Sequence, residues 1–301
     1  MLNKLKLEVQ DALNNKLDFI RNGQCVFNYI QRTYGIGYLI KEKYNVDCFY
    51  IDANIDAFLE CVVLELESTE IVCISDLHGT LPTNLPNGHM LIICGDIAPT
   101  NIDKSLLKST VWWATKFLSW AKSLSYEKII FIAGNHDFLL EKTDCILDLI
   151  DPDYDCDKLV YLQDELYSYR GIKFYGTPWV QELDKWAFYA PNDDLKIKFN
   201  EIPDNTDILI THEPPKIGNC GVILQSRHKK DCGCVELAEA ISNKPNIKYS
   251  VFGHIHSGEH RGTKNEHNTV MYNVSLKDEN YVIGYEPLII DYGKEIIKKR
   301  I

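Results

Sequence analysis

The sequence has no long hydrophobic run. Its apolar runs are about five to seven residues long, whereas a helix that spans a bilayer needs roughly 20. From Met1 to Lys4 the chain alternates apolar and polar or charged residues instead of placing a basic segment before an apolar block. A secretory signal is therefore not predicted, and we expect a cytoplasmic protein with no membrane partner.

Positive charge is also scarce. The 301 residues include 32 Lys and Arg against 43 Asp and Glu, which gives a formal net charge of −11. This balance repels a polyanionic backbone, so long nucleic acid is a disfavoured partner. The ten cysteines are scattered and include no pair separated by two residues, the spacing typical of structural zinc sites. We expect them to be reduced thiols.

Residues 1–68 differ from the rest of the chain and contain no catalytic motif. Apolar residues recur at helical spacing from Leu2 to Leu13, and Gly23 is a candidate helix stop. A second helix is predicted over Val26–Arg32, and the alternation from Val63 to Glu67 favours a strand. We predict a mostly helical extension of unknown role, through which the protein could form oligomers.

Residues 69–301 are predicted to form the catalytic domain. Short apolar runs there indicate buried strands, and they are Ile71–Ser75, Met90–Cys94, Ile129–Ala133, Ile208–Thr211 and Tyr249–Phe252. Asp103 is a candidate cap for a crossover helix with Leu107 and Leu118 on its apolar face, and Val235–Ile241 is a second helix.

Three closely spaced apolar segments follow toward the C-terminus. Val270–Val274, Tyr281–Tyr285 and Leu288–Asp291 favour antiparallel strands because the connections between them are short. Together with the alternating strands and helices before them, they predict an α/β fold of two facing mixed β-sheets flanked by helices.

Almost every predicted strand ends at a residue that can bind a metal ion. Successive strand ends carry Asp76 and His78; Asp96; Asn135 and His136; His212; and His254 and His256. Taken alone, an aspartate after a strand is more often a turn former, and a lone histidine is more often a hydrogen-bonded loop residue. The coincidence at successive strand ends favours a shared site, because such loops gather functional groups at one edge of a sheet.

The residue types indicate which ions the site would hold. Carboxylate, imidazole and amide oxygen together suit Mn, Fe or Zn, and two ions are needed to use all the donors. Asp76 and His78, like His254 and His256, are two residues apart, so both side chains of each pair can face one site. Asp96 can lie between the ions and bridge them.

The ordered set of motifs resembles the calcineurin-like metallophosphoesterase superfamily over about residues 70–292. The metallophosphoesterase domain-containing branch and its bacterial relatives are the most similar. That closer resemblance rests on three stretches: Gly176–Trp179 followed by Trp186–Phe188; Thr211–Pro215; and Phe252–His256 followed by Asn273–Ser275. The branch commonly has glutamate at the position of Asp137 and glycine at that of Glu213. The resemblance does not extend to residues 1–68.

The resemblance implies a four-layer fold and a ligand role for each motif residue. Asp76, His78 and His256 would hold one divalent ion, and Asn135, His212 and His254 the other, with Asp96 between them. We expect His136, which follows Asn135 directly, to be a catalytic residue that protonates the leaving oxygen or stabilises the charge that builds there. Trp179 could belong to the core or line the substrate cleft.

We therefore expect a dinuclear metal-dependent phosphoesterase. A hydroxide bridging the ions would attack phosphorus in line, and the favoured substrate is a small phosphodiester such as a cyclic nucleotide. The alternatives are a nuclease, a phosphomonoesterase or a protein phosphatase of the same superfamily, and a binding scaffold with weak activity.

Overall fold

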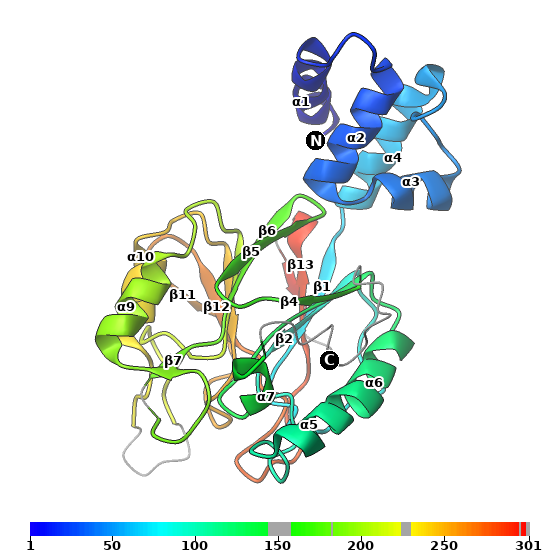
Figure 1. Cartoon of the computed structure of the whole chain (residues 1–301). Coiled ribbons are helices and arrows are strands. Elements are labelled where there is room, and N and C mark those ends of the chain that lie inside the picture. The colour runs from blue at the N-terminus through cyan, green and yellow to red at the C-terminus, as the bar shows by residue number, and fades with distance from the viewer. Residues whose placement is uncertain (144–157, 182, 224–229, 295, 299–301) are drawn as a thin grey trace. The chain divides into compact units, whose positions relative to one another are not determined.

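A computed structural model describes residues 1–143, 158–181, 183–223, 230–294 and 296–298 of the chain (Figure 1). The chain divides into two compact units. The helical unit comprises Met1–Thr69, Ser168–Lys173 and Asp291–Ile296, and the sheet unit comprises Glu70–Tyr167, Phe174–Ile290 and Ile297–Ile301.

The helical unit contains α1 (Leu2–Asn14), α2 (Asn22–Tyr34), α3 (Gly37–Tyr44), a 3₁₀ turn (Asp52–Asn54) and α4 (Ile55–Leu66). The predicted strand at Val63–Glu67 is wrong, because Phe58, Val62 and Leu66 form one buried face of α4. Gly23 does not end a helix either. It lies inside α2, where a Cβ atom would come within 1.9 Å of the Cys48 carbonyl oxygen.

A buried ion pair holds the helical unit together internally. The Arg170 side chain is fully buried, and its guanidinium Nη2 lies 3.1 Å from Oε1 of Glu65, while Nε lies 3.2 Å from Oγ1 of Thr69. Lys43 and Tyr44 also donate hydrogen bonds to Glu65, both at 2.8 Å. These contacts satisfy a carboxylate that is otherwise costly to bury.

The sheet unit is built on two β-sheets, as predicted, and each of them has six strands. The first has the order β14 (Ile296–Lys298), β13 (Leu288–Asp291), β1 (Glu70–Ile74), β2 (Met90–Cys94), β3 (Lys128–Ile132) and β4 (Leu159–Tyr161). The second has the order β11 (Thr263–Lys264), β12 (Val270–Asn273), β10 (Tyr249–Phe252), β9 (Ile208–Thr211), β6 (Ile172–Thr177) and β5 (Glu165–Tyr169). A small pair, β7 (Val180–Gln181) and β8 (Tyr189–Ala190), lies apart from both.

Parallel pairing joins the strands that matter for the site. β1 to β4 are parallel neighbours, and so are β6, β9, β10 and β12. Each of these parallel sets therefore brings its carboxyl ends to one edge of its sheet. The five residues of β2 and of β3 are all buried, which explains their continuous apolar runs.

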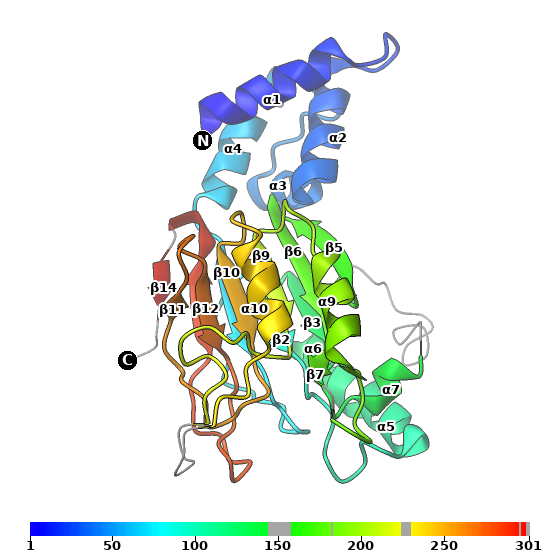
Figure 2. The same cartoon turned by 90° about the vertical axis from the view of Figure 1, so that its left-hand side faces the viewer.

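Helices cover the outer faces of both sheets (Figures 1 and 2). On the first sheet lie α5 (Leu106–Trp112), a π-helical turn (Trp113–Phe117) and α6 (Leu118–Ser123), with the Trp113 and Phe117 rings packed against Phe131 of β3. α7 (Phe138–Glu141) follows β3, and a 3₁₀ turn (Tyr292–Lys294) follows β13. On the second sheet α9 (Asn192–Asn200) and α10 (Val235–Ser242) pack against each other. Among the described residues, no helix combines the length and apolar character needed to cross a membrane.

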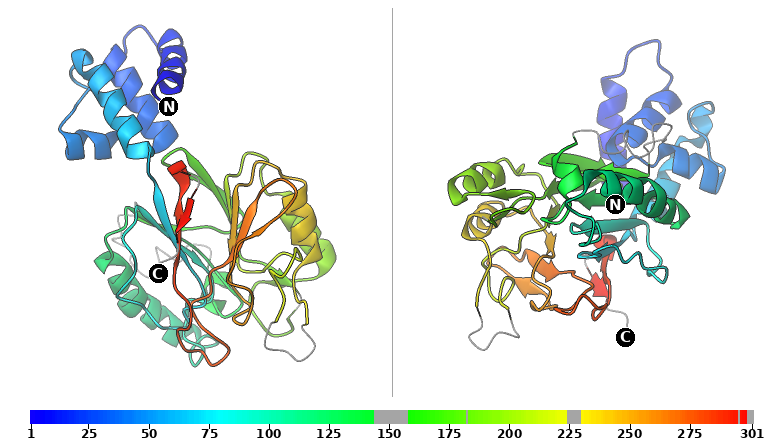
Figure 3. Two further views of the ribbon diagram at one scale, coloured as in Figure 1. Left: turned by 180° about the vertical axis from the view of Figure 1, so that it is seen from behind. Right: turned by 60° about the horizontal axis from the view of Figure 1, so that its bottom comes forward.

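Three local predictions are wrong. Tyr281–Tyr285 is not a strand: Tyr281 has φ = 62°, and the segment is a turn with a single bridge from Lys277 to Ile283. β12 and β13 are not antiparallel neighbours, because β12 pairs in parallel with β10, whereas β13 lies beside β1 in the other sheet (Figure 3). Asp103 does not cap α5, since Ser105 precedes that helix.

The structure also resolves the two alternatives for Trp179. Its indole N–H donates a hydrogen bond to Asp164 at 2.7 Å, and its ring packs edge-on against Phe188. Nζ of Lys198 lies 3.6 Å from the centre of the same ring. Trp179 is therefore a packing residue.

The buried ion pair generates a prediction about stability. Arg170→Met should lower the free energy of unfolding by about 3 kcal/mol, because it leaves part of the buried Glu65 charge uncompensated. Urea unfolding followed by far-ultraviolet circular dichroism measures the change. The control is Lys6→Met, which removes the exposed pair with Asp56 and should leave the unfolding midpoint unchanged. Equal midpoints for the two variants would contradict the role of Arg170.

Candidate metal centre

The side chains predicted at the strand ends meet in the sheet unit. Asp76 and His78 follow β1, Asp96 follows β2 and Asn135 follows β3, while His212 follows β9 and His254 and His256 follow β10. Strands β1, β2 and β3 of the first sheet and β9 and β10 of the second thus all contribute donors to one place. The convergence follows from the parallel order of the strands.

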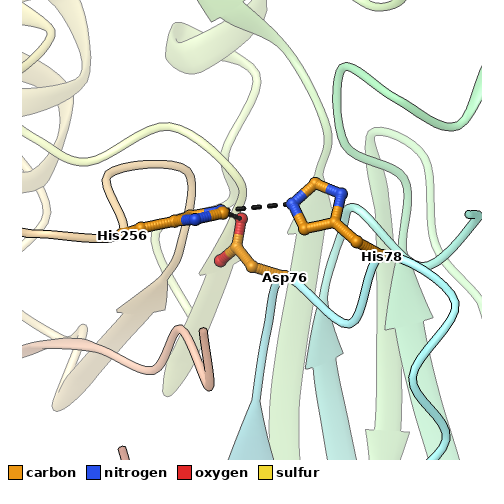
Figure 4. A group of neighbouring side chains, drawn as sticks. All are labelled: Asp76, His78 and His256. Carbon is orange, nitrogen blue, oxygen red and sulfur yellow. Dashed lines mark hydrogen bonds and ion pairs between the residues drawn. The ribbon is translucent and has the colours of Figure 1, made fainter. Parts of the chain in front are cut away.

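The first group of donors comprises Asp76, His78 and His256, all buried. Nε2 of His256 lies 3.3 Å from Oδ1 of Asp76 and 3.1 Å from Nε2 of His78. Figure 4 shows the three side chains pointing toward one another. Their donor atoms all lie within 4.8 Å, a spacing that one ion could occupy.

The second group surrounds His212. Nε2 of this ring lies 3.1 Å from Oδ1 of Asn135 and 3.4 Å from Oδ2 of Asp96. The His254 ring is a neighbour, with its centre 5.0 Å from that of His212. The opposite nitrogen of His212, Nδ1, donates a hydrogen bond to the Cys94 carbonyl at 2.7 Å, which fixes the orientation of the ring.

Asp96 lies between the two groups. Its Oδ2 atom is 3.4 Å from Nε2 of His212 and 3.7 Å from Nε2 of His78. Its Oδ1 atom accepts a hydrogen bond of 2.8 Å from the backbone N–H of His136. This is the position that a bridging carboxylate must occupy, and the ligand assignments themselves remain predictions.

The electrostatics of the cluster distinguish its imidazoles. Burial lowers the pKa of His78 and of His254 to about 4, so both rings are neutral near pH 7 and carry a free lone pair. Burial also acts against a charged His212, but the Asp96 carboxylate outweighs it and raises the pKa of His212 to about 10. In the absence of a metal ion, a proton on His212 thus partly offsets the carboxylates.

The backbone at the site is held in unusual conformations. Asp76, His78, Asp96 and His254 all have positive φ, between 42° and 69°. Such values are uncommon for residues other than glycine and persist only where the surroundings enforce them. Gly253 illustrates the crowding, because a Cβ atom there would come within 2.2 Å of Oδ2 of Asp76.

Two supporting residues were not predicted from the sequence. The buried carboxylate of Asp137 accepts the backbone N–H groups of Ala98 at 2.8 Å and of Gly134 at 2.9 Å, and so ties together the loops that follow β2 and β3. Ser275 donates its hydroxyl to Oδ2 of Asp76 at 2.5 Å. Ser275 belongs to a stretch that carries the family resemblance, and Asp137 follows His136 directly, but the sequence does not predict either role because both depend on which groups become neighbours on folding.

His136 lies at the same edge with a carboxylate partner. Its Nδ1 atom is 2.8 Å from Oδ2 of Asp103, the residue that had been predicted as a helix cap. The centre of its ring is 4.9 Å from that of His78 and 4.3 Å from that of Trp186. His136 is thus close to the donors, yet its backbone N–H, not its side chain, is what binds Asp96.

A cavity of about 590 Å³ opens above the cluster. Six of the predicted site residues line it, namely His78, Asp96, Asn135, His136, His254 and His256, whereas Asp76 and His212 lie beneath them, fully buried. Glu213 also lines the cavity, where burial raises its pKa to about 7 and Gln181 donates two hydrogen bonds to it. A small ligand can therefore reach the donors from this side.

The donor set fits divalent cations. In the described part of the chain, the ion-pair partners of Asp76 and Asp96 are imidazoles rather than Lys or Arg side chains. Two nitrogens that face each other at 3.1 Å beside a carboxylate form an arrangement that a cation between them would stabilise. Nδ1 of His78 is buried and has no hydrogen-bond partner among the described residues.

Comparisons with known proteins agree with this geometry. Residues 69–258 match the family model described as calcineurin-like phosphoesterase. Metallophosphoesterase domain-containing protein 1 of Homo sapiens is 33% identical over 244 residues, which cover 74% of this chain and 71% of that protein. The Mus musculus protein of the same name gives the same values. A solved crystal structure shares the fold with a TM-score of 0.56 at 15% identity, covering 77% of this chain and 98% of its own.

The protonated His212 generates a prediction about metal binding. A cation at its Nε2 atom must displace a proton that the ring holds with a pKa of about 10, so binding should release protons and strengthen as the pH rises from 6 to 8. Titration calorimetry of the metal-free protein with Mn²⁺, in buffers of different ionisation enthalpy, measures the release. The same proton uptake or release in His212→Ala as in the wild type would contradict this assignment.

Proposed function

Because the chain belongs to the calcineurin-like phosphoesterase family, and is therefore a metal-dependent phosphoester hydrolase, we propose that it cleaves a small phosphodiester. The observation that supports this choice is the charge of the cavity wall. Beyond the predicted ligands, Asp231 and Glu279 line the cavity, and Lys230 is its only Lys or Arg among the described residues. Glu213 also lines it, but with a pKa of about 7 it carries only part of a charge near neutral pH. A phosphomonoester approaches two negative charges near neutral pH, whereas a diester carries one, so the acidic wall favours the diester.

The size of the cavity supports a small substrate. Its volume of about 590 Å³ lies within the range of roughly 300 to 1,000 Å³ that is usual for small-molecule sites. A cyclic nucleotide is one candidate of suitable size. The net charge of −11 disfavours a polymeric phosphodiester.

The family uses a dinuclear divalent metal centre, and the structure contains groups of possible metal ligands at the strand ends, among them Asp76, His78 and His256, and Asp76, Asp96 and His212. Asp76, His78 and His256 would hold one ion, and Asn135, His212 and His254 the other. The position of Asp96 between the groups suits a carboxylate shared by both ions. The donor types suit Mn, Fe or Zn. Bound divalent ions would supply Lewis acidity toward the phosphoryl oxygens and toward water.

The protein itself supplies the proton for the leaving group through His136. Asp103 is the acceptor for Nδ1–H of this ring at 2.8 Å, which leaves Nε2 as the nitrogen available to the substrate. A proton donated from Nε2 to the ester oxygen neutralises the charge that develops as the P–O bond breaks. Asp103 acts as a positioning residue, because it orients the ring without contacting the substrate.

The proposed activity has a direct test. With Mn²⁺ present, the protein should cleave bis(p-nitrophenyl) phosphate faster than p-nitrophenyl phosphate, and Asp96→Ala should lose at least about 100-fold in kcat/KM because both ions lose a ligand. Product absorbance measures both rates. Faster cleavage of the monoester would exclude the diester preference. No turnover of monoesters, linear diesters or cyclic nucleotides with Mn, Fe, Zn, Co or Ni would contradict the enzymatic function itself.

The role of His136 has a separate test. His136→Ala should lower kcat by about 10² to 10⁴-fold while the metal content stays unchanged. The bond to Asp96 survives because it comes from the backbone N–H. Asp103→Asn should lower kcat less and should change the pH profile of kcat. Metal analysis by mass spectrometry accompanies the kinetics, and full activity in His136→Ala would remove His136 from the mechanism.

A further inference from the structure

Tyr281 forms part of the cavity wall, although the sequence motifs do not include it. The centre of its ring is 4.9 Å from that of His78 and 5.2 Å from that of His256. The residue is nevertheless 48% exposed, so one part of the ring contacts the predicted ligands and another part is open. A ring in this position can contact both the site and a bound molecule.

The turn that carries Tyr281 is tightly specified. Its backbone N–H donates to the Asp278 carbonyl at 2.9 Å, and the Asp278 side chain accepts the N–H groups of Asn280 at 2.9 Å and Val282 at 3.1 Å. Tyr281 itself has φ = 62°, a value that is costly for a bulky residue. The turn therefore imposes the position of the ring against a local conformational preference.

The same turn is attached to the metal centre. Nδ1–H of His256 donates to the Asp278 carbonyl at 3.0 Å, and the backbone N–H of Ser257 donates to Glu279 at 2.9 Å. These bonds fix the turn relative to His256, which contacts Asp76 through its other nitrogen. The ring of Tyr281 thus keeps a defined place beside the donors.

The order of the rings indicates which part of a substrate Tyr281 would meet. Trp186 neighbours His136 at 4.3 Å, His136 neighbours His78 at 4.9 Å, and His78 neighbours Tyr281 at 4.9 Å. The leaving oxygen must be near His136, the proposed acid. The ring contacts of Tyr281 are with His78 and His256, the two imidazoles of the first donor group, whereas Trp186 is the aromatic neighbour of His136. A substrate with its leaving oxygen at His136 therefore meets Tyr281 with the group that stays on phosphorus.

We propose that Tyr281 is a substrate-binding residue whose open ring contacts the retained ester group, and that this group is flat and aromatic, such as a nucleobase or an aryl ring. The inference rests on the proposed phosphodiesterase function. Stacking is the interaction that an exposed aromatic ring beside a polar site offers, and it accepts any flat partner.

Two substrates with the same leaving group test this assignment. Bis(p-nitrophenyl) phosphate and methyl p-nitrophenyl phosphate both release p-nitrophenol, but only the first retains an aryl group. Tyr281→Ala should raise KM for the diaryl ester roughly tenfold and leave KM for the methyl ester within about twofold. Tyr281→Phe, which keeps the ring, should behave like the wild type toward both.

Two further variants separate this role from a structural one. Tyr281→Asn removes the ring with a residue that tolerates positive φ, and it should reproduce the effect of Tyr281→Ala. Val282→Ala alters the same turn at an exposed position and should change neither KM. Equal changes in KM for both substrates, or none, would overturn the role of Tyr281 while leaving the phosphodiesterase function intact. If the wild type turns over neither these two esters nor any cyclic nucleotide, the proposed phosphodiesterase function is overturned, and the inference with it.

Discussion

The burial of two carboxylates, Asp76 and Asp96, is the constraint on which the rest of the site depends. Each ionised carboxylate costs several kcal/mol to remove from water unless partners compensate it. The partners here are imidazoles, and burial keeps the rings of His78 and His254 neutral. The carboxylates outweigh burial at the other two rings, where they raise the pKa of His212 to about 10 and that of His256 above its usual value. Divalent cations would replace protons held by these rings, so metal binding and the stability of the surrounding loops are thermodynamically linked.

Holding those carboxylates apart from water requires a rigid backbone. Four of the seven predicted ligands have positive φ, and the strain is balanced by groups that contact no substrate. Asp137 joins the loops after β2 and β3 through the N–H groups of Ala98 and Gly134, and Ser275 holds Asp76 from the side of β12. The Asp137 carboxylate reaches both loops although its side chain is short. The positions of the donors are thus determined by a second set of polar residues buried behind them.

Much of the fold could be predicted because its central strands are buried on both faces and read as continuous apolar runs, as at Met90–Cys94. The prediction of strands failed in segments that are buried on one face only or are exposed. The alternation in Val63–Glu67 belongs to the apolar face of α4, and the apolar residues of Tyr281–Tyr285 form an exposed turn. The site divides in the same way. Donors at strand ends were predictable because a parallel sheet gathers them, whereas the partnership of Asp103 with His136 joins residues 33 positions apart and depends on the fold.

One backbone carbonyl, that of Asp278, contacts both a predicted metal ligand and the turn that carries the proposed substrate-binding residue Tyr281. The carbonyl of Asp278 accepts Nδ1–H of His256, so it sets the orientation of a predicted metal ligand, and the same residue closes the turn that carries Tyr281. A change in the backbone of that turn would disturb His256, because the carbonyl would move with it. A change in the side chain at position 281 would not. Single side chains on this turn can therefore change the substrate preference while the backbone of the turn stays bonded to His256. For this reason the motifs specify the reaction but not the substrate.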